Sequence, residues 1–178
     1  MCKNISLVSL IVLLIISSCA SSGDMSREEQ KALKQEQAKS DLNSVKLVLE
    51  SGKYMFHAQS VQPSGGKTIQ LNSTIYTLDL KDNMAKADLP FFGRGYTSHH
   101  TSDPGIKFEG EPEDYTLVEN TKKNSVLVKF SVKGPNEKFD VILSISSNGT
   151  GNLSIVSQHR QGISYFGYLK EMPDDYAF

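Results

Sequence analysis

The chain has 178 residues, a mass of 19.7 kDa and a formal net charge of −1, which allows one domain of ordinary size. Its near-neutral charge argues against a nucleic-acid-binding protein, because such proteins carry an excess of basic residues. It also argues against a protein held at a membrane surface by charge alone.

Residues 1–18 have the pattern of a secretory signal peptide, with Lys3 ahead of an apolar run over residues 7–16. The run is too short for a membrane-spanning helix, which needs about 20 residues. The sequence Ile16-Ser17-Ser18-Cys19 resembles the lipobox of bacterial lipoproteins, which implies cleavage before Cys19 and acylation of that cysteine. The alternative is an ordinary secretory signal with an incidental cysteine.

A lipidated Cys19 predicts that the mature protein is anchored to a bilayer, since two or more acyl chains hold a protein stably at a membrane. Residues 19–25 are small and polar and would serve as a flexible tether. Ala20 stands where lipoproteins retained at the inner membrane carry Asp, so the resemblance implies the outer membrane. We expect the periplasmic face, with surface exposure as the alternative. Removal of Cys2 and acylation of Cys19 would leave no thiol for a disulfide, a metal or catalysis.

An N-terminal helix is predicted over residues 26–51. Ser26 and Glu29 have the spacing of a capping box, and Gly52 is a suitable residue to end the helix. One helical stripe, spaced by three and four residues, is formed by Ala38, Leu42, Val45 and Leu49. We expect this stripe to pack on the rest of the domain.

Over residues 53–178, apolar side chains recur at every second position and no longer at the helical spacing of 3.6, which indicates strands. The clearest alternation places four side chains on one face: Val128, Phe130, Val141 and Leu143. About eight or nine short strands with hairpin-length connections indicate antiparallel neighbours in an all-β fold. We predict an up-and-down β-barrel with an N-terminal helix, because closure removes exposed strand edges. A two-sheet β-sandwich is the alternative.

The segment from residue 89 to residue 105 interrupts the alternation and is the longest connection, a kind of segment that is often functional. We expect it to run over one rim of the barrel. The candidate ligand-binding residues of this rim are Phe91, Phe92, Arg94, Tyr96, His99 and His100. In one interpretation the aromatics line a pocket mouth and Arg94 binds a carboxylate or phosphate. In the other, which we favour, the aromatics plug the barrel end and Arg94 folds back onto carbonyls or an acid.

Metal binding and catalysis find little support in the sequence. His99 and His100 are adjacent, so in an extended segment their side chains point to opposite faces and rarely bind one ion. The possible further ligands are Asp103, His57 and His159, but together these residues form no recognised metal-binding motif. No serine lies in a Gly-x-Ser-x-Gly motif. We therefore predict no metal site, no cofactor and no enzymatic activity.

Several segments together carry a resemblance to a known family: Phe56-His57-Ala58, Leu89-Pro90-Phe91-Phe92-Gly93-Arg94, Gly105-Ile106-Lys107-Phe108 and Ile163-Ser164-Tyr165-Phe166-Gly167. They resemble DUF family 4251, whose members are secreted or lipid-anchored proteins of Gram-negative bacteria. The resemblance spans roughly residues 45–170 and implies a lipocalin-like β-barrel. It implies no activity, since the family has no assigned function.

These observations predict a non-enzymatic lipoprotein of the cell envelope. Our first hypothesis is a binding module that holds a small amphiphilic ligand inside the barrel or at its rim. The alternative is a protein–protein interaction or inhibitor module of the envelope, with a filled barrel. An interior volume of roughly 300 Å³ or more would favour the first hypothesis.

Overall fold

The structure, a computed structural model, describes residues 26–72, 74–95, 105–173 and 175–176. The chain divides into two compact units, residues 1–34 and residues 35–178. The predicted signal peptide, Cys19 and the tether over residues 19–25 lie outside the described residues. No helix in the described part of the chain is long and apolar enough to cross a membrane.

The helix α2 spans Arg27–Glu50, one residue shorter at each end than the sequence predicts. Its first turn has the expected capping box, in which the Ser26 amide donates to Glu29 Oε2 at 2.9 Å and the Glu29 amide donates to Ser26 Oγ at 3.2 Å. The helix is followed by Gly52, which adopts a φ of 65°. Three side chains of the predicted stripe are buried: Leu42, Val45 and Leu49.

The strands follow in chain order. They are β1 (Tyr54–Pro63), β2 (Ile69–Gln70), β3 (Tyr76–Lys81), β4 (Met84–Leu89), β5 (Ile106–Gly110), β6 (Glu113–Asn120), β7 (Ser125–Lys133), β8 (Lys138–Ser146), β9 (Thr150–Ser157) and β10 (Ile163–Glu171).

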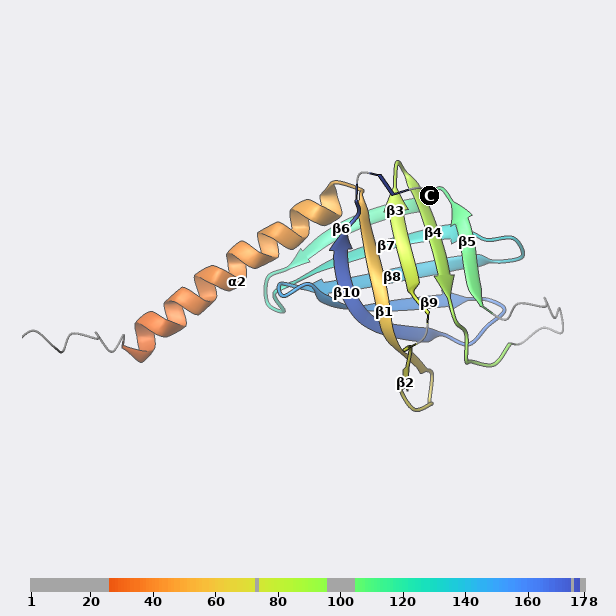
Figure 1. The fold of residues 1–178 in the computed structure, drawn as a ribbon, viewed down its shortest axis with the longest axis horizontal. Helices are drawn as coiled ribbons and strands as arrows, with labels where there is room; N and C mark the ends of the chain where they lie inside the picture. The colour runs from red at the N-terminus through yellow and green to blue at the C-terminus, as the bar shows by residue number, and fades with distance from the viewer. Residues whose placement is uncertain (1–25, 73, 96–104, 174, 177–178) are drawn as a thin grey trace, which may run out of the picture. The chain divides into compact units, whose positions relative to one another are not determined.

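The strands form one antiparallel sheet in the order β5-β4-β3-β1-β10-β9-β8-β7-β6, with the short β2 added to β1. Figure 1 shows β1, β3, β4 and β5 running across β6, β7, β8 and β9, with the curved β10 between the two groups in the sheet. The predicted fold class is confirmed: the protein is mostly antiparallel β with one N-terminal helix, and its nine-strand sheet curls into a half-barrel. A lipocalin-like arrangement is compatible with this topology.

The curl stops short of a closed barrel between β5 and β6. Only residues 111–112 separate these two strands, yet no ladder joins them among the described residues. Pro112 has no N–H to donate, and a register shift between Glu113 and Thr116 interrupts β6. The two sides of the sheet still meet in the core, where the rings of Phe108 and Phe139 have centroids 5.5 Å apart.

The hydrophobic core lies between the two groups of strands and forms one cluster of buried side chains. It includes the four side chains predicted from the clearest alternation, which are at most 4% exposed: Val128, Phe130, Val141 and Leu143. The register also agrees, since Val128 faces Leu143 and Phe130 faces Val141. The alternation therefore identified both the buried face and the strand pairing.

Two glycines and a bulge bend the sheet at β1, β9 and β10. Gly167 pairs with Gly151 on one side and with Ala58 on the other. A Cβ on Gly167 would overlap the carbonyl oxygen of His57, and one on Gly151 would lie 2.7 Å from the Ser144 carbonyl oxygen. The register shifts between Ala58 and Ser60, and such a bulge bends its strand. Glycine is therefore required where the strands approach most closely.

Candidate functional site

The structure describes three of the six predicted rim residues. Phe91 is half-buried and packs against the core, whereas Phe92 is 48% exposed and Arg94 is exposed. Tyr96, His99 and His100 lie outside the described residues. The rim therefore provides one half-buried anchor and two exposed side chains within the described part of the chain.

The rim segment is held to the turn after β9 mainly by its backbone. Gly95 forms an isolated β-bridge with Arg160. The Gln161 amide donates to the Arg94 carbonyl oxygen at 2.9 Å, and the Tyr165 hydroxyl donates to the Pro90 carbonyl oxygen at 2.8 Å. These contacts place the segment without using the Arg94 side chain.

Arg160 performs the structural role that the sequence analysis expected of Arg94. Its Nε donates to Glu137 Oε1 at 2.6 Å and its guanidinium also donates to the Gly105 carbonyl oxygen at 2.9 Å. The guanidinium lies over the Phe91 ring at 5.3 Å from the centroid. Arg94, by contrast, is exposed and its guanidinium contacts no acceptor among the described residues. The expectation for Arg94 is corrected, because buried partners surround Arg160 and not Arg94.

A second feature is a hollow of about 610 Å³ on the outer face of β1, β3, β4 and β10, which we call the Asp79 hollow. Cross-strand pairing determines which residues form the base of the hollow, since Asp79 on β3 lies between Met55 on β1 and Lys86 on β4. The apolar part of its lining comes from Met55, Ile75, Pro173 and Tyr176. The ionisable part comes from His57, Asp79, Lys86, Asp88, Lys170 and Glu171.

The carboxylate of Asp79 is buried although it faces away from the core. The residue is 2% exposed, and the Tyr176 hydroxyl donates to its Oδ2 at 2.9 Å. Its Oδ1 is buried without a hydrogen-bond partner among the described residues. Burial raises the pKa of Asp79, and this effect outweighs the lowering by Tyr176, Thr77 and the nearby positive charges.

The C-terminal residues cover this carboxylate. Met172 is buried, and the Lys81 ammonium donates to the Tyr176 carbonyl oxygen at 2.6 Å. Lys86 pairs with Asp79 across the sheet, and its Nζ lies 3.3 Å from Glu109 Oε2. The carboxylate of Asp79 is thus covered by a tyrosine while its neighbouring lysine contacts another acid.

His57 stands at the edge of the Asp79 hollow. Its Nε2 lies 2.8 Å from Met55 Sδ, and its ring centroid lies 5.5 Å from that of Tyr168. Burial and the charge of Lys170 lower its pKa, so the imidazole is mostly neutral at pH 7. Among the described residues, no group of three His, Cys, Asp or Glu side chains could hold a metal ion.

The arrangement around Asp79 is suited to binding. An apolar wall beside a poorly satisfied carboxylate favours a ligand with a hydrocarbon part and a hydrogen-bond donor. The alternation over residues 76–80 puts Asp79 on the face opposite Leu78 and Leu80, but it gives no indication that Asp79 is buried. A sequence feature that points to burial there is the aromatic pair Tyr176 and Phe178 after the last strand; Phe178 lies outside the described residues.

Comparison with known proteins places these features in context. The family model described as "Domain of unknown function (DUF4251)" matches residues 36–169. The chain is also similar to the crystal structure of a DUF4251 family protein from Bacteroides eggerthii DSM 20697 at 1.95 Å resolution, with a TM-score of 0.59 and 15% identity over 76% of this chain and 91% of that one. No curated protein matches the chain. At this identity, the likeness shows the fold.

Proposed function

We propose a function from the chain's own surface, because the chain belongs to the DUF4251 family, which is described only as a domain of unknown function. The protein is a non-enzymatic lipoprotein of the cell envelope, anchored by Cys19 to the outer membrane, where it faces the periplasm. It binds a small amphiphilic ligand. The anchor is supported by the lipobox-like sequence before Cys19.

The ligand site of this proposal is the Asp79 hollow and not the inside of the barrel. Core side chains from both groups of strands form one buried cluster between them. The Asp79 hollow, at about 610 Å³, lies within the range of about 300–1,000 Å³ typical of small-molecule sites. It also combines apolar and ionisable lining in one place.

The observation that carries the proposal is the buried Oδ1 of Asp79, which has no hydrogen-bond partner among the described residues. Such a group costs free energy until a donor satisfies it. Movement of Tyr176, whose hydroxyl donates to the neighbouring Oδ2, would admit an ammonium or hydroxyl group, while the hydrocarbon part of the ligand rests on Met55, Ile75 and Pro173.

The buried cluster of side chains between the two groups of strands favours a second candidate function, a protein–protein interaction or inhibitor module of the envelope. In that case the half-barrel is a rigid scaffold, and its outer surface contacts another protein. The exposed side chains of the edge strand β6, among them Val118 at 56% exposure, are suited to such a contact.

Native mass spectrometry of the lipoprotein purified from its own host tests the proposal. We expect a small molecule retained non-covalently by the wild type and lost from both Asp79→Asn and Ile75→Ser. Asp140→Asn, an exposed acid on β8 outside the hollow, is the matched control and should keep the molecule. A wild-type mass equal to that of the acylated chain alone would overturn the proposal. A stoichiometric protein in the same preparation would support the interaction module instead.

A further inference from the structure

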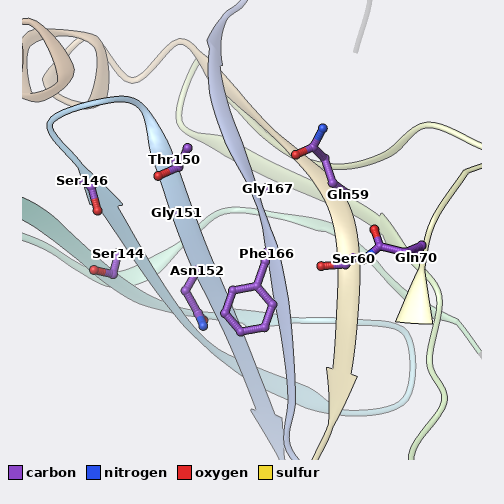
Figure 2. Close-up of a pocket in the computed structure, with 10 residues that line it drawn as sticks. All are labelled: Gln59, Ser60, Gln70, Ser144, Ser146, Thr150, Gly151, Asn152, Phe166 and Gly167. Carbon is purple, nitrogen blue, oxygen red and sulfur yellow. The ribbon is translucent and has the colours of Figure 1, made fainter. Parts of the chain in front are cut away.

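A second hollow lies on the outer face of the sheet, at the bend between β8, β9, β10 and β1 (Figure 2). Its volume is about 550 Å³. Cross-strand pairing aligns five of its side chains in one row, since each member faces the next across the sheet. In order across the strands, the row is Ser144, Asn152, Phe166, Ser60 and Gln70. We call this row and the hollow around it the amide groove.

An exposed aromatic ring stands at the centre of the row. Phe166 is 38% exposed, and Figure 2 shows its ring between Asn152 on one side and Ser60 and Gln70 on the other. The bulge in β1 adds Gln59 to the same surface. Four strand spacings of about 4.8 Å give the row a length of about 19 Å. An elongated ligand would therefore meet a ring at its middle and hydroxyl and amide groups along its length.

The amide groups in the groove are available to a ligand. Within the described part of the chain, the side chains of Asn152, Gln59 and Gln70 take part in no hydrogen bond or ion pair. Each carries both a donor and an acceptor. Free amides beside an aromatic face can bind hydroxyl groups at their edges and C–H groups over the ring.

The groove continues into a neighbouring hollow of about 440 Å³, which shares Gln59 and Gln70 with it. That hollow adds more uncharged polar groups, including Asn72, Thr74 and Tyr76. Charged residues make up 22% of the chain, but among the described residues no Asp, Glu, Lys or Arg lines either hollow. His57 is the titratable imidazole there, and its lowered pKa leaves it mostly neutral at pH 7.

We propose that the amide groove binds an uncharged carbohydrate chain. A sugar ring has apolar C–H faces that stack on an aromatic ring and a periphery of hydroxyl groups that both donate and accept. Phe166 meets the first requirement, and the amides and hydroxyls of Asn152, Gln59, Gln70 and Ser144 meet the second. A charged ligand would find no Asp, Glu, Lys or Arg partner among the described residues of either hollow and would lose hydration without compensation.

Saturation-transfer NMR with the full chain tests this proposal, using soluble neutral oligosaccharides of glucose, mannose, galactose and N-acetylglucosamine as probes and an oligosaccharide of uronic acid for comparison. We expect at least one neutral probe to bind, with the uronic acid probe weaker. Raising the salt concentration from about 0.05 to 0.5 M should change the neutral affinity by less than about twofold, since screening acts on charges.

Variants separate the groove from the rest of the surface. Phe166→Ala and Asn152→Ala should each weaken binding about tenfold or more, and Phe166→Tyr should retain it because the ring is kept. Val156→Ala, another exposed position on the outer face of β9, is the matched control and should bind as the wild type does. The amphiphile proposal is tested by a molecule retained in the purified lipoprotein, whereas this inference is tested by added neutral sugars, so the failure of one is distinguishable from the failure of the other. Absence of binding to every neutral probe at millimolar concentration, or binding only to the charged probe, would overturn the inference.

Discussion

Replacing Arg160 by Met tests the arginine that holds the rim in place. Met keeps an apolar stem against Phe91 but removes the guanidinium that donates to Glu137 and to the Gly105 carbonyl oxygen. The side chain of Glu137 is only 6% exposed, and its Oε2 already has no hydrogen-bond partner among the described residues. The variant would leave this acid buried and uncompensated.

The expected magnitude follows from the burial of the pair. Removing one partner of a fully buried ion pair costs about 3–5 kcal/mol. The Arg160 side chain is 21% exposed, so solvent screens part of the interaction, and we expect a loss of about 2–3 kcal/mol. At about 2–4 °C per kcal/mol for a domain of this size, the Tm should fall by roughly 5–10 °C.

Thermal and urea unfolding, followed by circular dichroism, measure this loss. Arg94→Met is the matched control, because Arg94 lies in the same rim segment with an exposed side chain, and its Tm should change by less than about 1 °C. Adding Glu137→Gln to Arg160→Met should recover at least half of the loss, since the buried charge is removed. Equal Tm values for Arg160→Met and the wild type would refute the reasoning. A large drop in Arg94→Met would return the structural role to Arg94.

Three further predictions address the anchor, the core and the buried acid. Cys19→Ser should abolish lipidation and release the protein from the membrane fraction; continued partitioning, with a control lipoprotein variant released, would contradict the anchor. Phe130→Ala should lower the free energy of unfolding by about 3–5 kcal/mol in urea titrations, because Phe130 is 4% exposed, and a loss below about 1 kcal/mol would be inconsistent with its burial. The raised pKa of Asp79 means that the folded state holds a proton which the unfolded chain releases, so stability falls as pH rises from about 3.9 toward the folded pKa. Asp79→Asn should remove this part of the pH dependence, and an unchanged slope would show that Asp79 titrates normally.

Local sequence patterns were enough to predict the helix and most of the strands of this protein. The capping box at Ser26 and Glu29 depends on residues three apart, and alternation along a strand depends on residues two apart. Both kinds of pattern are complete within a short window of the chain. Short connections then favoured antiparallel neighbours, and the resulting fold class is confirmed, including the buried face that carries Phe130 and Val141.

The tertiary structure alone decided which polar residues are buried and which are brought together. Arg160 meets Glu137, 23 residues away, and Gly105, 55 residues away, so nothing near Arg160 in the chain distinguishes it from the exposed Arg94. Asp79 is buried because Tyr176, 97 residues later, covers it. Alternation specifies which face a side chain takes. Whether that face is covered, or gathers polar side chains around a ring as it does at Phe166, depends on strands and terminal segments that are distant in the sequence.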